Sequence, residues 1–228
     1  MFMKKNRFVI KKTFKSKKNK VKLVLMEKSL IVMKQFNSKN MLEGEYKILR
    51  RGCERLNIPK PLGINIEGKT LFMSYIPSKN LCDVINSSSV PLKVKNECME
   101  KLASWLVDFH SYFKSSEGVM IRGDSILRNF ILDEENNIWG LDFEESRYGM
   151  PEEDIAGICS SVLDTNPMFT NWKVELCKRF IDAYKSLSGW EVKNVNKLVF
   201  KALMEKAGRR KNGVVLTKFA KSIENLDF

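Results

Sequence analysis

The sequence lacks the segments and residue patterns that mark several common classes of protein. It has no run of the roughly 18 uncharged apolar residues that a membrane span requires, and its five cysteines are widely spaced, without a Cys-x-x-Cys pair. This pattern favours reduced thiols over a disulfide framework or a zinc site. The basic N-terminal residues also lack the continuous apolar segment of a secretion signal. We therefore expect a cytoplasmic protein with no membrane partner.

The chain does contain enough apolar material for a folded core. Of its 228 residues, 43% are hydrophobic, including 14 Phe and 4 Trp, which argues against disorder. A chain of this length predicts one domain or two tightly joined lobes. The only histidine, His110, lies on an expected helix without a partner for nucleophilic or metal chemistry, so we interpret it as structural.

The positive charge is concentrated at the start of the chain. The formal net charge is +13, and residues 1–22 contain ten Lys or Arg and no acid, so the remaining residues carry only +3. Clustered lysines attract phosphates, which makes RNA or another polyanion one candidate partner of this segment. A solvated surface and contact with nucleotide phosphates are the alternatives. Alternating apolar residues such as Phe8 and Ile10 also predict strands here.

Hydrophobic periodicity predicts an α+β chain in two parts. The first part has five strands, near 7–14, 21–27, 30–36, 62–66 and 69–76, and one helix, near 38–56. The second is mostly helical, with helices near 93–113, 151–164, 171–187 and 191–207, a hairpin of 130–132 and 138–141, and a short tail. We therefore predict an N-terminal lobe of residues 1–76 and a helical C-terminal lobe of residues 77–228.

One stretch carries the residues that most strongly indicate chemistry. Asp124 and Asn129 lie five residues apart across a loop, and Asp142 follows thirteen residues later, after the hairpin. Because a hairpin can bring its two ends together, these side chains could share one cleft. Oxygen ligands suit Mg²⁺, and a further Asp can accept a hydroxyl proton. The alternative interpretation is two ordinary loop acids and a turn asparagine.

The pattern Gly123-Asp124-x-x-x-x-Asn129, a hairpin and Asp142-Phe143 resembles the catalytic and metal-binding loops of the protein-kinase-like phosphotransferases. Asp142-Phe143-Glu144 is similar to the aminoglycoside and choline kinase branch. The short length and the basic end resemble the small atypical kinases of the RIO and KEOPS-associated type. The resemblance implies a two-lobed protein-kinase-like fold, with a five-stranded N-terminal lobe carrying one helix and a mainly helical C-terminal lobe.

The resemblance also implies which residues bind the nucleotide. Lys34, after Val32-Met33, resembles the lysine on the third strand that holds the phosphates of ATP. Glu45, on the following helix, would be its ion-pair partner, although Glu43 lies only two residues earlier. The segment that includes Ser74 and Ile76 would be the hinge whose backbone meets adenine.

The remaining roles belong to the catalytic stretch. By the same resemblance, Asn129 and Asp142 would hold Mg²⁺ or Mn²⁺. Asp124 would orient and deprotonate the acceptor hydroxyl, and the γ-phosphoryl group would pass to it in line. We assign Arg128 to neutralising charge on the transferred group, because it lies between Asp124 and Asn129.

Several positions depart from the family pattern. Arg122 stands where a histidine is usual, and Glu144 replaces the glycine of Asp-Phe-Gly. No glycine precedes Gly44, so the phosphate loop cannot be glycine-rich, and a lysine-rich segment at 15–20 stands in its place. Asp154 has two interpretations, since it either begins a helix or ties the helical lobe to the catalytic loop.

These features together predict an ATP-dependent phosphotransferase, specifically an atypical Ser/Thr protein kinase or an ATPase-like kinase, that transfers the γ-phosphate to a hydroxyl acceptor. One alternative is a small-molecule kinase of the aminoglycoside or choline type. The other is a pseudokinase that acts as a nucleotide- or RNA-binding module. The partner is thus a protein or small-molecule hydroxyl substrate.

Overall fold

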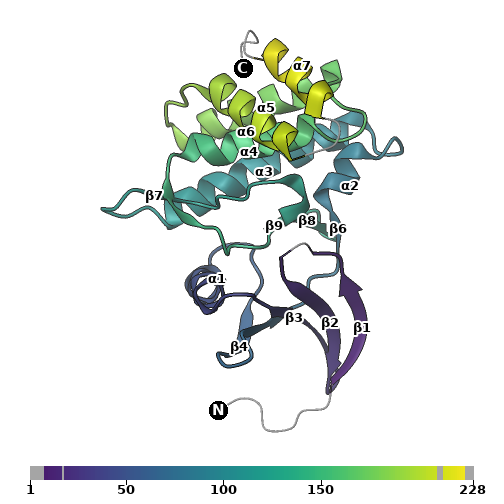
Figure 1. The fold of residues 1–228 in the computed structure, drawn as a ribbon, viewed down its shortest axis with the longest axis vertical. Helices are drawn as coiled ribbons and strands as arrows, with labels where there is room; N and C mark the ends of the chain where they lie inside the picture. Colours follow the sequence, from purple (N-terminus) through teal and green to yellow (C-terminus); the bar gives the residue numbers. More distant parts are fainter. Residues whose placement is uncertain (1–7, 17, 210–212, 224–228) are drawn as a thin grey trace. The chain divides into compact units, whose positions relative to one another are not determined.

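The computed structural model describes residues 8–16, 18–209 and 213–223, and it divides the chain into two compact units (Figure 1). The first unit comprises Met1–Pro77 together with Trp139–Glu145, and the second comprises Ser78–Ile138 and Ser146–Phe228. The chain therefore leaves the first unit once and returns to it for a short segment.

The first unit is built on a five-stranded antiparallel sheet with the order β1-β2-β3-β5-β4. Its strands are β1 (Phe8–Phe14), β2 (Lys20–Met26), β3 (Ser29–Gln35), β4 (Pro61–Asn65) and β5 (Thr70–Ser74). A single long helix, α1 (Lys39–Gly52), accompanies them. The predicted five strands with one helix are confirmed.

The sheet and α1 place two charged residues inside this unit. Lys34 lies on the central strand β3, opposite Val21 of β2 and Leu71 of β5. On α1, Glu45 lies between Leu42 and Leu49 in the buried stripe, at a position where helical spacing predicts an apolar residue. Because a buried carboxylate needs a partner, this position already requires a cation nearby.

The returning segment is joined to the first unit by a backbone hydrogen bond and contains one buried aromatic side chain. The N–H of Gly140 donates to the carbonyl of Asn57 at 3.0 Å, and Phe143 is only 1% exposed. Asp142, between them, has a φ of 63°, in the left-handed region that non-glycine residues adopt infrequently. The segment thus holds Asp142 in a defined and unusual backbone conformation.

The second unit is a group of packed helices with short strands. Its helices are α2 (Leu81–Asn86), α3 (Leu92–Tyr112), α4 (Pro151–Leu163), α5 (Asn171–Ser188), α6 (Val195–Gly208) and α7 (Gly213–Ile223). The strands are β6 (Ser78–Asn80), β7 (Val119–Ile121), β8 (Phe130–Asp133) and β10 (Arg147–Gly149), and β9 (Ile138–Gly140) leads back to the first unit. Within the described residues, no helix has both the length and the apolar character needed to cross a membrane.

The structure corrects the sequence prediction at several short elements. The predicted tail after residue 207 is wrong, because residues 213–223 form α7, which buries Leu216, Ala220 and Ile223 and packs on α6. The strands β6, β7 and β10, of three residues each, and the six-residue α2 were not predicted. They are too short to show a hydrophobic period, so tertiary pairing such as that of β7 with β10 decides them.

Helix α4 passes close to the loop that contains Asp124. A Cβ atom added to Gly157 of α4 would lie 2.9 Å from the carbonyl oxygen of Ser125, which is closer than real Cβ atoms approach backbone. A glycine at this position therefore lets the helix support the loop directly.

We predict that Gly157→Ala lowers the free energy of unfolding by about 1–3 kcal/mol, because the methyl group forces α4 and the loop apart. Gly44→Ala is the matched control, since Gly44 lies within α1 and an added Cβ meets nothing within 4 Å. Alanine there should stabilise the protein by up to about 1 kcal/mol through its helix propensity. Urea denaturation measures both, and equal effects of the two substitutions would contradict the close approach.

Candidate functional site

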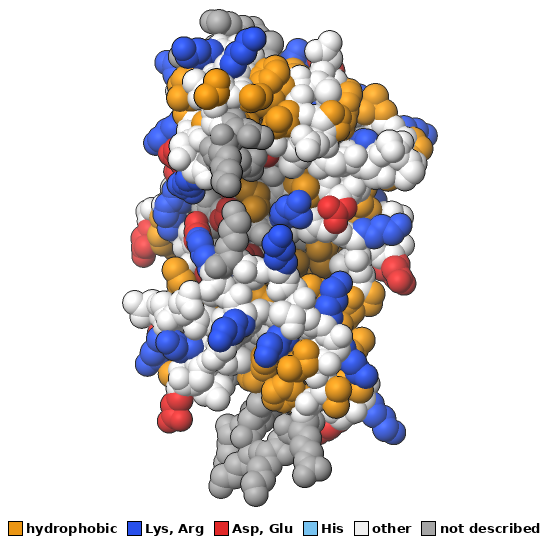
Figure 2. All heavy atoms as spheres, turned by 45° about the vertical axis from the view of Figure 1, so that its right-hand side comes forward, with side chains coloured by type: hydrophobic (Ala, Val, Ile, Leu, Met, Phe, Trp, Pro, Cys, Tyr) orange, Lys and Arg blue, Asp and Glu red, His pale blue; other side chains and the backbone are white. Residues whose placement is uncertain are grey.

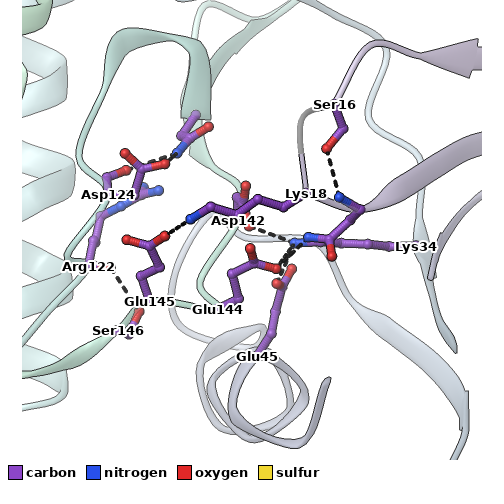
Figure 3. A network of polar contacts seen from close by, with 12 residues as sticks. Ser16, Lys18, Lys34, Glu45, Arg122, Asp124, Asp142, Glu144, Glu145 and Ser146 are labelled. Atoms are coloured by element: carbon purple, nitrogen blue, oxygen red, sulfur yellow. Dashed lines mark hydrogen bonds and ion pairs between the residues drawn. The ribbon is translucent and has the colours of Figure 1, made fainter. Parts of the chain in front are cut away.

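The charged group in the first unit is centred on the ammonium of Lys34. Its Nζ lies 2.6 Å from Oε2 of Glu45, 2.6 Å from Oδ1 of Asp142 and 3.4 Å from a carboxylate oxygen of Glu144 (Figure 3). The side chains of Lys34, Glu45 and Glu144 are 6%, 2% and 4% exposed. We call Lys34 with these three acids the lysine–carboxylate cluster. Glu45, not Glu43, is the partner, and Glu43 faces Lys39 at 3.6 Å.

In this cluster, burial and the attraction between opposite charges have opposite effects on the pKa values of Lys34 and Glu45. Burial alone would lower the pKa of Lys34, but the attraction of Glu45, Asp142 and Glu144 outweighs it and raises that pKa, so the ammonium is charged. Burial raises the pKa of Glu45 to about 7; the repulsion of Asp142 and Glu144 adds to the rise, while Lys34 opposes it. One ammonium therefore does not fully compensate three carboxylates.

The donor set fits a divalent cation that prefers oxygen ligands. Glu45, Asp142 and Glu144 each offer a carboxylate oxygen, and these oxygens lie within 4.8 Å of one another. Such ligands suit Mg²⁺ and Mn²⁺. The Asp142 side chain is 37% exposed, so solvent reaches it. Its left-handed φ of 63° is the kind of unusual backbone geometry that concentrates at functional sites.

The lysine-rich loop between β1 and β2 is tied to the returning segment by side chains. The ammonium of Lys18 pairs with the carboxylate of Glu145, and Nδ2 of Asn19 donates to Oε2 of Glu144 at 2.5 Å (Figure 3). The backbone N–H of Asn19 also donates to Oγ of Ser16 at 3.3 Å. Acidic side chains of the same unit thus engage part of a loop for which contact with phosphates was one of the interpretations left open by the sequence.

Most of the other lysines described in the basic segment are exposed to solvent. The residues at 1–7 and 17 lie outside the described part of the chain, while Lys11, Lys12, Lys15 and Lys20 are exposed. On the face drawn in Figure 2, Lys and Arg side chains are spread among hydrophobic and acidic ones and do not form one continuous patch.

The predicted hinge lies at the end of the sheet of the first unit. Ser74 is the last residue of β5, its N–H donates to the carbonyl of Lys60 at 2.9 Å, and its Oγ accepts from the N–H of Lys60 at 2.9 Å. Ile76 follows it, half-buried, just before the chain passes into the second unit. Lys60 therefore fixes the backbone at the start of the expected hinge.

In the second unit, the structure brings Asp124 and Asn129 together. Nδ2 of Asn129 donates to the carbonyl oxygen of Asp124 at 2.9 Å and to its Oδ2 at 3.2 Å. The N–H of Asn129 closes a turn with the carbonyl of Ile126 at 2.9 Å. Because these bonds use the amide nitrogen, they direct the carbonyl oxygen of the Asn129 side chain away from Asp124.

A buried carboxylate on α4 holds the start of this loop. Asp154 accepts from the N–H of Arg122 at 2.7 Å, from the N–H of Gly123 at 3.1 Å and from Nε2 of His110 at 3.0 Å. Nδ1 of His110 lies 2.8 Å from the hydroxyl of Tyr184. Asp154 therefore ties the helical unit to the loop, and the buried His110 has the structural setting expected of it.

The two arginines of the loop differ sharply in environment. Arg122, fully buried, places its guanidinium 4.2 Å from the ring centre of Phe130 and 5.2 Å from that of Trp105, an arrangement of cation–π type. This packing accommodates an arginine at the position where the resemblance led us to expect a histidine. The side chain of Arg128 is exposed, and its backbone carbonyl accepts from Nδ2 of Asn80 at 2.9 Å.

Sequence reasoning missed two contributors to the first unit. Glu144 was noted only as a replacement for glycine, and Asn19 only as part of a lysine-rich loop. The available signal was the pair of acids directly after Asp142-Phe143, which places further negative charge beside any group that Asp142 binds. No sequence pattern indicated that Asn19 would contact Glu144.

Comparisons with known proteins support the fold. A scan against protein-family models found no match, and neither did a search of curated proteins. Among solved structures, a candidate aminoglycoside phosphotransferase from Ralstonia eutropha JMP134 aligns with a TM-score of 0.69 and 12% identity, over 96% of this chain and 91% of that one. The kinase PK-1 of Cydia pomonella granulovirus aligns with a TM-score of 0.48 and 21% identity, over 62% and 55%. The chain has the predicted two-part, α+β protein-kinase-like fold.

We predict that Asp154→Asn lowers the free energy of unfolding by about 3 kcal/mol at neutral pH, because it removes a buried charge that compensates several donors. Burial opposes the charge of Asp154, but hydrogen bonds from His110 and Arg122 outweigh it and keep its pKa below the usual 3.8. The charge therefore stabilises the fold above pH 3.8, and its contribution falls as the pH drops toward the lowered pKa.

Denaturation of wild type and variant at neutral and acidic pH measures this difference. Asp182→Asn is the control, because Asp182 is exposed on α5 and its change should cost less than about 0.5 kcal/mol. If the difference in unfolding free energy between the wild type and Asp154→Asn stayed constant down to pH 2.5, it would contradict the negative charge that we assign to Asp154 in the folded protein.

Proposed function

We propose that the protein is an ATP-dependent phosphotransferase that moves the γ-phosphate to a hydroxyl acceptor. The observation that carries the proposal is the buried ammonium of Lys34, shared between Glu45 and Asp142 at 2.6 Å each. A buried lysine held charged and oriented by a carboxylate is suited to bind phosphate oxygens. The protein-kinase-like fold supports the same proposal.

In this proposal the residues of the first unit bind the nucleotide. Lys34 contacts the phosphates while Glu45 fixes its orientation, and the backbone near Ser74 and Ile76 meets the adenine. Asp142 holds Mg²⁺ or Mn²⁺, which would neutralise charge that develops on the phosphates. The left-handed backbone of Asp142 supports an orienting role for its carboxylate.

The loop of the second unit acts on the acceptor in this proposal. Asp124 receives the hydroxyl proton, since its carboxylate is partly exposed and its backbone is fixed by Asn129. The hydrogen bonds that Asp154 accepts from the N–H groups of Arg122 and Gly123 hold this loop in place on its own unit before the acceptor binds. Arg128, which is exposed, adds positive charge beside the loop.

We propose a protein Ser/Thr hydroxyl as the acceptor, as in an atypical protein kinase or an ATPase-like kinase, on the sequence argument that a helical lobe of this length offers little of an elaborated small-molecule pocket. A second candidate is a small-molecule hydroxyl. The alignment over 96% of this chain with a candidate aminoglycoside phosphotransferase favours that alternative.

We predict that ATP with Mg²⁺ or Mn²⁺ raises the thermal midpoint of the wild-type protein, because a ligand that binds only the folded state stabilises it. Asp142→Asn should lose most of this rise. Glu67→Gln is the control, since Glu67 lies in the exposed turn between β4 and β5. The absence of any shift at millimolar ATP with either metal would count against nucleotide binding.

We predict that the wild-type protein transfers labelled γ-phosphate to a hydroxyl acceptor or to water, and that Asp124→Asn slows this at least about 100-fold, as loss of a general base does. Mixed Ser/Thr peptides, aminoglycosides and choline are the acceptors to compare. Equal transfer by wild type and variant would contradict the role of Asp124. Nucleotide binding without transfer to any acceptor or to water would instead identify a pseudokinase.

A further inference from the structure

The second unit contains a cavity of about 250 Å³ where the end of α3, the start of α4 and the end of α5 meet. It is lined by the aromatic side chains of Tyr184 and Trp190, by the charged ones of Lys114, Glu152 and Glu191, and by three aliphatic residues. Every lining residue belongs to the second unit. A cavity of this size suits a small ligand or a single side chain of a partner.

Glu152 gives this cavity a negative charge that the chain itself does not compensate. The residue is half-buried, and its Oε1 accepts one long hydrogen bond, from the N–H of Lys193 at 3.3 Å. No Lys or Arg in the described part of the chain forms an ion pair with it. Glu191, by contrast, is exposed and pairs with the ammonium of Lys193 at 2.9 Å. Burial raises the pKa of Tyr184, and the negative charges of Glu152 and Asp154 add to the rise, so their negative potential reaches the cavity wall.

Trp190 supplies an aromatic wall that already accommodates a cation. The ammonium of Lys114 lies 5.1 Å from the centre of the indole ring. The indole stacks with the imidazole of His110, with ring centres 6.4 Å apart, and meets the ring of Tyr184 edge-on at 6.5 Å. The hydroxyl of Tyr184 lies 2.8 Å from Nδ1 of His110, which fixes both neighbours of the indole. An aromatic face held in this way attracts cations.

The carboxylate, the indole and the aliphatic residues together favour one kind of ligand. An organic cation places its charge near Glu152 and Trp190, and its apolar stem lies along the aliphatic residues. An organic anion fits less well, because Glu152 and Glu191 repel it. Lys114 is exposed and pairs with no carboxylate of the described residues, so its ammonium is weakly held over the indole.

We propose that this cavity binds a guanidinium or alkylammonium group carried on an apolar stem, with Glu152 as the counter-charge and Trp190 as the aromatic wall. The ligand displaces the ammonium of Lys114 from the indole. Two sources share this chemistry, a free small molecule and an Arg or Lys side chain of a protein that the enzyme phosphorylates. Only the second source rests on the proposed function, because the cavity belongs to one unit and binding needs no nucleotide.

The test is titration of the full chain, without nucleotide, with butylguanidinium. The readout is the indole N–H resonance of Trp190 in isotope-labelled protein, assigned by its loss in Trp190→Leu. This resonance should shift with a roughly millimolar dissociation constant, as expected of a ligand with few atoms. Butylurea, which has a similar shape without the charge, and pentanoate, which has the opposite charge, should each bind at least about tenfold more weakly.

Two variants should change the affinity for butylguanidinium in opposite directions. Glu152→Gln should raise the dissociation constant at least about fivefold, because it removes the counter-charge. Lys114→Met should lower it at least about threefold, because it removes the competing ammonium. The matched controls, Glu175→Gln on α5 and Lys201→Met on α6, change exposed charges outside the cavity and should have little effect. Thermal melts show that each variant folds, and if Trp190→Leu does not fold, the two charge variants decide the question.

A comparison of ligands distinguishes the two sources. A blocked peptide with one arginine between alanines carries the same guanidinium group as butylguanidinium. Tighter binding of this peptide would identify a protein segment as the source. Weaker binding of the peptide would identify a free small cation, because the cavity then excludes the peptide backbone.

Several results would overturn the proposal. These are an unchanged Trp190 resonance far above millimolar butylguanidinium, equal binding of butylurea, an unchanged affinity in Glu152→Gln, or equal effects of Lys114→Met and Lys201→Met. Because no nucleotide is present, each of these failures leaves the proposed function standing. Conversely, a protein that binds butylguanidinium as proposed but shows no ATP-dependent thermal shift would refute the proposed function and leave this site standing.

Discussion

The buried ammonium of Lys34 and the acids around it are the interaction on which the rest of the first unit depends. A lysine on the central strand of a sheet and a glutamate in the apolar stripe of a helix are each unfavourable alone. Together, 2.6 Å apart, they fix α1 on the sheet. The third partner, Asp142, explains why a segment of only seven residues, Trp139–Glu145, returns to this unit.

The second unit also depends on a buried charge that is compensated by its hydrogen-bond partners. There the buried carboxylate of Asp154 is compensated by backbone N–H groups and by the imidazole of His110. Because Asp154 lies on α4, which packs on α5 and α6, its hydrogen bonds tie the loop around Asp124 to the packed helices. In each unit, a buried ionic group thus helps to position polar residues for which we propose a function.

The sequence predicted those elements and loops of the structure that produce a recognisable pattern among neighbouring residues. Alternation in the first 36 residues and the apolar runs near 62–66 and 69–76 predicted the five strands, and helical spacing after Ser38 predicted α1, to within a few residues. The spacing of Asp124, Asn129 and Asp142 identified the loops. Contacts between distant residues left no such pattern. Glu144 reaches both Lys34 and Asn19, and the stacking of Arg122 on Phe130 depends on tertiary packing. The prediction of a tail after residue 207 was wrong, although the apolar residues there have helical spacing.

The central claim is that Lys34, held in place by its acids, binds the phosphates of a nucleotide. Calorimetric titration of wild type and Lys34→Met with ATP, ADP and AMP in the presence of Mg²⁺ tests it most directly. The account predicts that the wild type binds ATP and ADP more tightly than AMP, and that Lys34→Met, folded as shown by its thermal melt, loses this preference. Equal affinity of the wild type for all three nucleotides, or an unchanged preference in Lys34→Met, would contradict it.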